Sequence, residues 1–271
     1  MCVLAFAWHA HPRWQLVLAG NRDELHARPA APLARWDAPD HIIAGRDLTA
    51  GGTWLGISEQ GRLAVVTNLR GYGMAAPGMA SRGALVADLL ARQGGHDDPL
   101  RIDPTAFNPF NLIIADPAQA RFLTNRPIRR TLLGRRVRPI MPQLLASGIH
   151  GLSNGALDAP WPKTLQLEMA MRDWLAQDGD DPAALFDALR SETLRPLGAP
   201  PDQPSDVPQE ARQSPVFIRD PVYGTRCSTV VAIGADGGGE IIEQRFDAAG
   251  EPAGRSRFAF RWPPLIQIRM R

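Results

Sequence analysis

Cysteine is scarce in this chain, and the two residues present are far apart. Cys2 and Cys227 are the only cysteines among 271 residues, too few for a disulfide framework and without the clustered spacing of a structural zinc site. Long apolar runs are also missing, because none approaches the ~20 residues that cross a bilayer. The first residues carry no leading positive charge and are too interrupted for a signal peptide. We therefore predict a cytoplasmic protein without a membrane span.

A strong charge of either sign is absent as well. The 30 basic and 28 acidic residues give a formal net charge of +2, without the basic excess of a dedicated nucleic-acid binder. Lys163 is the single lysine, so the basic side is almost entirely arginine, and Ala and Pro usage points to a GC-rich coding bias. Hydrophobic residues at 44% and charged residues at 21% are ordinary globular usage, which suffices for a sizeable core.

Turn residues divide the chain into predicted strands and helices. Apolar segments bounded by Gly, Pro, Asn and Asp predict strands, and Ser81 and Asp181 stand where helix caps are expected. Helices segregated from largely antiparallel sheets predict one α+β domain over 1–271. The segment 196–215, rich in Pro, Gln, Asp and Ser, is predicted as a surface loop. The predicted strands are Cys2–Trp8, Trp14–Ala19, His41–Gly45, Thr53–Ser58, Leu63–Thr67, Phe110–Ala115, Ala120–Leu123, Arg226–Ile233, Glu240–Phe246 and Arg257–Trp262, and the predicted helices are Gly83–Arg92, Pro162–Gln177 and Pro182–Glu192.

Cys2 is the most informative position for chemistry. Cysteine is small, so an aminopeptidase is expected to remove Met1, which leaves a thiol beside a free α-amine. The reference pKa of such an amine is ~7.7–8.0, so it can act as a base at neutral pH. One residue would then supply both nucleophile and base, the N-terminal-amine form of nucleophilic catalysis. A buried cysteine that merely begins a strand is the structural alternative.

A polar cluster, Asn21-Arg22-Asp23-Glu24, follows the predicted strand Trp14–Ala19 and Gly20. Such a cluster at a strand end is a common place for site residues, because a loop presents them at the sheet edge. A carboxylate in this cluster would hold the amine of residue 2 in position. A solvated turn is the alternative interpretation.

Three further polar residues lie at strand ends. Asn68 and Asn154 each end an apolar segment, and either amide could donate to a developing oxyanion, a contact worth about 3 kcal/mol in a transition state. A plain turn asparagine is the alternative at both positions. Arg226 begins a predicted strand and would favour a thiolate by its charge. If Arg226 points into the site, Cys227 faces the opposite way and belongs to the core.

Two weaker signals concern ligand binding. His9 and His11 lie two residues apart and would share a strand face, but no third metal ligand is evident, so we predict no metal site. The stretch Arg126–Arg138 contains six arginines and is predicted as an exposed hairpin with a solvated face. As a binding site it would suit phosphates or carboxylates, such as a nucleotide-bearing acyl carrier or the propionates of haem.

Seven short motifs occur in a fixed order and span nearly the whole chain. They are Met1-Cys2, Asn21-Arg22-Asp23-Glu24, Gly51-Gly52-Thr53-Trp54-Leu55-Gly56, Thr67-Asn68-Leu69-Arg70, Ser81-Arg82-Gly83, Gly151-Leu152-Ser153-Asn154 with Pro160-Trp161-Pro162-Lys163, and Tyr223-Gly224-Thr225-Arg226. Together they resemble the NRDE family, also called the transport and Golgi organisation protein two family. That family in turn resembles, more distantly, N-terminal cysteine amidases such as bile-salt hydrolase and penicillin V acylase.

The resemblance implies a four-layer αββα fold of the Ntn-hydrolase type and a set of site residues. Cys2 is expected as nucleophile, Asp23 as the partner of its amine, and Arg226 as thiol activator. Asn68 and Asn154 are expected as oxyanion or amine contacts. The residues expected to bind substrate are Asn21, Arg22, Trp54 and Arg70.

One position departs from the amidase pattern. The amidases place an arginine three residues before the aspartate, where this chain has Gly20. In this sequence Arg22 lies one residue before Asp23 instead.

The predicted function is hydrolysis or transfer of an acyl group through a thioester at Cys2, with a small acyl conjugate as substrate and no cofactor. The alternative is a non-catalytic carrier, because family members have been linked to haem movement and to lipid or acyl-coenzyme A homeostasis. Its partner would be a haem-like or acyl ligand. The sequence has no Cys-x-x-Cys-His and no evident axial histidine to support haem attachment.

Overall fold

The first strand shows how this sequence builds its layers. In β1 (Cys2–Trp8) every residue after Cys2 is buried. Successive side chains of a strand point to opposite faces. Even-numbered residues from Leu4 onward enter one core, whereas odd-numbered residues from Val3 onward enter another. A strand buried on both faces requires a layer of structure on each side.

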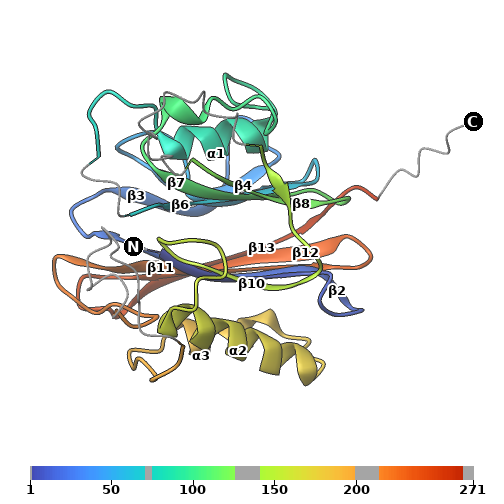
Figure 1. The fold of residues 1–271 in the computed structure, drawn as a ribbon, viewed down its shortest axis with the longest axis vertical. Helices are drawn as coiled ribbons and strands as arrows, with labels where there is room; N and C mark the ends of the chain where they lie inside the picture. The colour runs from blue at the N-terminus through green and yellow to red at the C-terminus, as the bar shows by residue number, and fades with distance from the viewer. Residues whose placement is uncertain (1, 71–74, 126–140, 199–213, 265–271) are drawn as a thin grey trace, which may run out of the picture.

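The computed structural model describes residues 2–70, 75–125, 141–198 and 214–264, and in these two antiparallel sheets lie face to face (Figure 1). Their facing surfaces enclose one continuous apolar core. Sheet A has the order β10-β1-β2-β11-β12-β13, and sheet B has the order β3-β4-β5-β6-β7-β8-β9. Besides β1, sheet A contains β2 (Trp14–Leu25), β10 (Gly148–Leu152), β11 (Tyr223–Gly234), β12 (Gly238–Phe246) and β13 (Pro252–Arg261). Sheet B contains β3 (Ala30–Arg35), β4 (Ile42–Asp47), β5 (Leu55–Ser58), β6 (Arg62–Asn68), β7 (Phe110–Ala115), β8 (Ala120–Thr124) and β9 (Gln143–Leu144).

Helices cover the two outer faces of this pair of sheets (Figure 1). The helix α1 (Arg82–Ala91) buries its leucines against sheet B, and Ser81 caps it by accepting from the Ala84 N–H. The helices α2 (Pro162–Ala176) and α3 (Leu185–Leu189) pack on sheet A and close a third core. Two 3₁₀ turns are η1 (Pro104–Ala106) and η2 (Pro182–Ala184). The predicted α+β class and the αββα layering are confirmed.

The predicted strands and the first two predicted helices are confirmed, with most bounds close to those predicted, but β2 continues beyond Ala19 to Leu25 and β13 begins at Pro252, before Arg257. The third predicted helix, Pro182–Glu192, is shorter, since it consists of η2 and α3. Asp181 caps it as predicted, by accepting from the Ala183 N–H. The predicted hairpin Arg126–Arg138 and most of the predicted loop 196–215 lie outside the described residues. No described helix is long and apolar enough to cross a membrane.

Two predictions about the first hairpin are wrong. The polar cluster Asn21-Arg22-Asp23-Glu24 is not a loop, because β2 runs through it to Leu25. Neighbouring elements hydrogen-bond the Asn21 amide and Asp23 Oδ1, so these polar residues can continue the strand. His9 and His11 do not share a strand face, because β1 ends at Trp8 and both histidines lie in the following turn.

The strands β3, β9 and β10 are not predicted by the sequence pattern. Both β3 and β10 lie at sheet edges, where proline is tolerated because one side of the strand has no ladder to complete. The edge position explains Pro32 in β3, whereas Gly151 in β10 lies where α2 comes too close for a side chain.

Candidate active site

Cys2 begins β1 at the edge of the inter-sheet core. Its side chain shares a face with Leu4, and the two residues line a small cavity of ≈ 20 Å³ between the sheets together with Gly20, Arg22 and Trp54. That volume holds about one water molecule. The thiol is half-buried and unbridged. The described residues therefore leave space beside the thiol for a reacting carbonyl group, and little more.

The backbone of Cys2 is held from the neighbouring strand end. Its N–H donates to Asn154 Oδ1 at 3.0 Å, and its carbonyl accepts from Ser153 Oγ at 2.7 Å. Asn154 is fully buried, and its Nδ2 donates to the Asn68 carbonyl at 2.7 Å. The Asn154 carbonyl accepts from the Arg70 N–H at 3.0 Å. Asn154 thus links the nucleophile to the end of sheet B.

The structure brings Asn68 and Arg70 to the site through their backbones. Asn68 ends β6 with an exposed side chain, whereas its carbonyl faces Asn154. Arg70 follows two residues later and is half-buried. The predicted oxyanion contact of Asn68 and the predicted substrate contact of Arg70 stay predictions.

Arg22 lies directly across the sheet from Cys2. The two residues are register partners in the β1–β2 pair, so their side chains share the inter-sheet face. The Arg22 guanidinium carbon lies 4.4 Å from the Trp54 ring centroid, which is a cation–π contact. Its Nη1 is buried and makes no hydrogen bond with the described residues. An unsatisfied donor of this kind costs about 1–3 kcal/mol, so Arg22 offers a donor to a ligand next to the thiol.

Gly20 leaves little room for a side chain on the face of β2 that carries Arg22. A Cβ at Gly20 would lie 2.9 Å from the Cβ of Leu4 and 3.1 Å from the Val3 carbonyl, too close for a side chain without a shift of β1. Arg22 lies two residues further along β2 and therefore on the same face as Gly20. It provides a guanidinium on that face where the strand has more room.

Asp23 lies on the opposite face of sheet A, beneath the helices. Because Cys2 pairs with Arg22 in an antiparallel ladder, the nitrogen end of Cys2 points toward Asp23, the next residue of β2. The Thr225 hydroxyl donates to Asp23 Oδ1 at 2.8 Å, and the Tyr223 hydroxyl donates to the Asp23 carbonyl at 2.9 Å. Burial raises the pKa of the Asp23 carboxyl above its usual value, although Lys163 and Thr225 oppose this shift.

The Thr225 hydroxyl can donate in one direction only. Its oxygen accepts from the Ile218 N–H at 2.9 Å, which leaves its single proton for Asp23. Gly224 allows this approach, since a Cβ there would lie 2.8 Å from the Ile218 carbonyl. The motif around Thr225 therefore positions the carboxylate.

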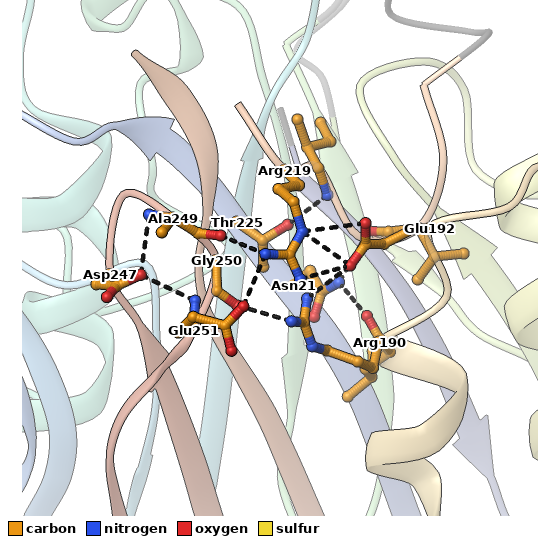
Figure 2. A network of polar contacts seen from close by, with 12 residues as sticks. Asn21, Arg190, Glu192, Arg219, Thr225, Asp247, Ala249, Gly250 and Glu251 are labelled. Carbon is orange, nitrogen blue, oxygen red and sulfur yellow. Dashed lines mark hydrogen bonds and ion pairs between the residues drawn. The ribbon is translucent and has the colours of Figure 1, made fainter. Parts of the chain in front are cut away.

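A network of ion pairs and hydrogen bonds at the surface stabilises the segment that contains Ile218. Arg219 donates to Glu192, Glu251 and the Ala249 carbonyl (Figure 2). Arg190 donates to the Gly250 carbonyl and to Glu192 in the same network (Figure 2). Exposed ion pairs are individually weak, but these contacts tie the segment to the end of α3 and to the β12–β13 turn.

Asn21 fastens the same segment from the sheet side. Its Nδ2 donates to the Leu189 and Val216 carbonyls, each at 2.8 Å, and its Oδ1 accepts from Ser228 Oγ at 2.6 Å. Both amide hydrogens are therefore used within the fold, on the helix side of sheet A. Asn21 therefore supports the fold at this position. Its amide has no hydrogen left to donate to a substrate, the contact that was predicted.

Arg226 lies at a β-bulge in the β2–β11 pair, where the register shifts between Thr225 and Cys227. Its Nη1 donates to the Leu25 carbonyl at 2.7 Å and to the Arg28 carbonyl at 2.9 Å. The activating role predicted for Arg226 stays a prediction.

Cys227 is buried, as predicted, but it does not face away from the site. It pairs with Arg22 across the sheet and therefore shares the face of Cys2. The alternation expected from Arg226 fails because the bulge adds one residue. Burial, with Glu243 close by, raises the pKa of the Cys227 thiol well above its usual range, which makes it a poor nucleophile.

Arg82 is a cation of this site that the sequence analysis did not identify. Burial lowers the pKa of its guanidinium, and the influence that most opposes this shift is a negative charge at Cys2. It begins α1, whose first turn approaches the loop between β4 and β5 so closely that a Cβ at Gly52 would lie 2.1 Å from the Gly83 carbonyl carbon. The signal in the sequence is the motif Ser81-Arg82-Gly83.

A much larger hollow lies at the other end of the first hairpin. It has a volume of ≈ 690 Å³ and is lined by His9, His11, Trp14 and Gln15, with residues from the ends of other strands. His11 Nε2 lies 3.1 Å from Asp178 Oδ1. Within the described residues no group of three or more His, Cys, Asp and Glu side chains could hold a metal ion.

Comparisons with known proteins agree on one family. A family model described as Transport and Golgi organisation 2 matches residues 1–248. The human Transport and Golgi organization protein 2 homolog is 32% identical over 255 residues, which covers 88% of this chain and 90% of that protein. The Drosophila melanogaster Transport and Golgi organization protein 2 is 25% identical over 271 residues, covering 90% and 92%.

Two solved structures are also similar to this chain. One is the Caenorhabditis elegans ortholog of N-acylethanolamine-hydrolyzing acid amidase, with a TM-score of 0.44 and 12% identity over 84% of this chain and 92% of that one. The other is the conjugated bile acid hydrolase from Clostridium perfringens, with a TM-score of 0.43 and 9% identity over 97% of each chain.

Proposed function

This chain belongs to the Transport and Golgi organisation 2 family, and we propose that it is an N-terminal-nucleophile cysteine hydrolase or acyltransferase acting on an amide or other acyl conjugate. The observation that carries the proposal is the position of Cys2. Its backbone nitrogen is fixed by Asn154 at 3.0 Å, and its thiol shares a cavity with the unsatisfied guanidinium of Arg22. A cysteine that only begins a strand needs neither feature.

The reaction begins after removal of Met1. The α-amine of Cys2 takes the thiol proton, and the thiolate attacks the acyl carbon. The bond from that carbon to the leaving nitrogen or oxygen breaks, and the α-ammonium returns its proton to the leaving group. A thioester remains on Cys2. Water, or another acceptor in a transferase, then gives a proton to the amine, attacks the thioester and releases the acyl group with the thiol restored.

The surrounding residues divide the work of orientation and charge stabilisation. Asn154 and Asp23 hold the amine, Arg82 and Arg226 favour the thiolate, and the Asn68 amide donates to the oxyanion. Arg22 offers its free donor to a substrate oxygen, either the reacting carbonyl or a carboxylate on the acyl conjugate. Trp54 keeps the guanidinium in place by stacking on it.

The first test is the intact mass of the purified protein. We expect a mass that lacks Met1 and that increases by one acetyl group on Cys2 during reaction with p-nitrophenyl acetate. Cys2→Ser replaces the thiol by a hydroxyl group of similar size and serves as the matched variant. Retained Met1, or acetylation of Cys2 no faster than that of a free cysteine in solution, contradicts the proposal.

A second candidate function rests on a different observation. The hollow of ≈ 690 Å³ beside His9 and His11 has the volume of a small-molecule site, and imidazole is a common axial ligand of haem. The hollow therefore favours carriage of a haem-like ligand, or of a lipid or acyl-coenzyme A. Titration with haemin tests the haem-like ligand: a Soret band that His9→Ala weakens supports the carrier, and an unchanged haemin spectrum contradicts it.

A further inference from the structure

Lys163 has an unusual position for a charged side chain. It is the single lysine of the chain, and it is 0% exposed in the first turn of α2. Burial of an ammonium is costly unless a partner compensates it. The partial positive charge at a helix N-terminus adds to that cost. A surface arginine elsewhere in this protein meets neither penalty.

The fold holds Lys163 over the helix side of sheet A. The helix α2 packs on β1 and β10, and Gly151 of β10 permits a close approach, since a Cβ there would lie 2.2 Å from Thr164 Cγ2. Lys163 Nζ donates to Ser214 Oγ at 2.9 Å. Ser214 lies two residues before Val216, whose carbonyl accepts from Asn21. The ammonium is therefore enclosed between the helix and the face on which Asn21 and Asp23 lie.

The charges around Lys163 come from three elements. Asp23 of β2 and Cys2 of β1 favour its charged form, whereas Arg70, which follows β6, disfavours it. Burial is the largest influence and lowers the pKa of Lys163 to about 8. Lys163 in turn lowers the pKa of Asp23, together with Thr225. The ammonium thus acts on the carboxylate and on the nucleophile from one position.

An N-terminal nucleophile needs this kind of charge. An ionised Asp23 alone would hold the Cys2 α-amine as ammonium, which cannot accept the thiol proton. A second positive charge next to the pair offsets the carboxylate, so the amine stays available as a base, and the same charge favours a thiolate. The first effect keeps the amine unprotonated before the reaction, and the second stabilises the thiolate once the proton has left.

We propose that Lys163 is a positioning residue for the N-terminal nucleophile, whose buried ammonium keeps Asp23 ionised and stabilises the thiolate that forms at Cys2. The inference rests on the proposed function, because it assigns a role within the same site. It adds a residue on the far side of sheet A from the thiol. Lys163 touches neither substrate nor the reacting atoms in this role.

The rate of Cys2 alkylation by iodoacetamide, measured from pH 5.5 to pH 9, tests the role of the charge. Lys163→Met removes the charge at similar length, and Lys163→Arg retains it. We expect the methionine variant to react three- to tenfold more slowly at pH 7, roughly the effect of one unit charge at several ångströms, with an unchanged plateau at high pH. The arginine variant should regain most of the rate. A purely structural loss would lower the plateau instead.

The single lysine allows a second test without any change at position 163. Lysine labelled with ¹³C at Cε gives one side-chain resonance, whose titration should have a midpoint near pH 8. Cys2→Ala and Asp23→Asn should each move this midpoint downward, because each removes a negative charge that favours the ammonium. A midpoint that is the same in all three proteins overturns the inference, as does a Lys163→Met alkylation profile that superimposes on the wild-type profile.

These outcomes are distinct from failure of the proposed function. Retained Met1 or an unreactive Cys2 in the wild-type protein would overturn the proposed enzyme itself. A reactive wild-type Cys2 combined with an unchanged Lys163→Met profile would overturn the role of Lys163 alone.

Discussion

The two ends of the β1–β2 hairpin differ in what they offer a ligand. The Cys2 end has a cavity of ≈ 20 Å³ among buried charged residues. The end at His9 and His11 has a hollow of ≈ 690 Å³ beside a turn, with histidines near the surface. If volume alone identified active sites, the second end would be chosen. The first end instead gathers buried ionisable groups with shifted pKa values, and such groups cluster at functional sites.

The difference follows from what each arrangement demands of the fold. A hollow at a turn buries no charged group, so the fold needs no compensating contact to form it. Buried Asp23 and Lys163 each shift toward the neutral form, so the fold bears a cost to keep them charged. Each of the following predictions breaks or sharpens the contrast between the two ends.

Substitution of the nucleophile should have the largest effect. Cys2→Ala is expected to lower acyl turnover by on the order of 10⁴-fold or more, as for the loss of other catalytic nucleophiles. The measurement is the release of p-nitrophenol from an acyl ester under steady-state conditions. Cys227→Ala removes the other thiol and should keep turnover, because Cys227 is buried and a poor nucleophile. Equal losses of turnover in the two variants would show that Cys2 is not the nucleophile.

Neutralisation of the buried carboxylate should separate activity from stability. Asp23→Asn is expected to reduce turnover on the order of 10²-fold, the range of a general acid–base contribution. Because burial raises the pKa of Asp23 in the folded protein, its contribution to stability is complete below about pH 4 and is lost as pH rises through the folded-state value. Urea unfolding at several pH values measures this loss.

The control is the pH profile of the variant itself. Over a window that begins at about pH 4 and extends upward, the free energy of unfolding of the wild-type protein should fall relative to that of Asp23→Asn. A constant difference between the two proteins across this window would show that Asp23 is not perturbed by burial.

A methyl group between the loop at Gly52 and α1 should loosen the Cys2 end. Gly52→Ala places a Cβ 2.1 Å from the Gly83 backbone, and overpacking of this kind costs about 1–3 kcal/mol of the free energy of unfolding. Arg82 should move with α1, so alkylation of Cys2 at pH 7 should slow as well. Gly95→Ala is the matched control, because a Cβ there meets nothing within 4 Å. Equal denaturation midpoints for the two variants would contradict the close approach.

The hydrogen bond from Thr225 to Asp23 should have a smaller effect. Thr225→Val removes the donor, which raises the pKa of Asp23 further, and a hydrogen bond to a charged group is worth about 1.5–3 kcal/mol. We expect turnover at pH 7 to fall about tenfold or more. In a plot of turnover against pH, the acid limb should move to higher pH. Thr225→Ser keeps the hydroxyl and should retain the wild-type limb. If wild-type protein, Thr225→Val and Thr225→Ser all had the same acid limb, Thr225 would have no role in the site.

Change at the other end of the hairpin should have the least effect on Cys2. His11→Ala lies beyond the end of β1, about 20 Å along the strand from Cys2, so acyl turnover should stay within about twofold of the wild-type value. The same variant is informative for haemin binding in the large hollow. A large loss of turnover in His11→Ala would mean that the two ends do not act independently.

The predictable part of the site comes from short-range rules. Alternation along β1 places Cys2 on the face of Leu4, and Ser81 caps α1 as its type and position predict. The motifs also identify Asp23 and Asn154 as partners of Cys2. Asn154 Oδ1 accepts from the Cys2 N–H at 3.0 Å, and the contact of Asp23 with the amine stays a prediction. The strand through Asn21-Arg22-Asp23-Glu24 could not be predicted. Consecutive polar residues indicate a loop unless their distant hydrogen-bond partners are known.

Lys163 and Arg82 show a second limit of sequence analysis. A lysine in the first turn of a helix normally faces solvent, and nothing local indicates that Lys163 is enclosed by Ser214 and the face of sheet A. Arg82 likewise reads as an ordinary surface arginine beside a helix cap. Burial is a property of the assembled layers, so neither cation could be assigned to the nucleophile beforehand.

The sequence by itself determined the family, the candidate nucleophile and the local geometry of each segment. A small residue after Met1, alternating strands and capped helices follow from side-chain size, backbone period and local hydrogen bonds. The tertiary structure decided which groups meet. Thr225 and Asp23 are 202 positions apart and lie 2.8 Å from each other, and the register of three strands aligns Cys2, Arg22 and Cys227. Such contacts, and the charge states that burial imposes on them, exist only when the sheets have paired, because desolvation depends on everything packed around a group.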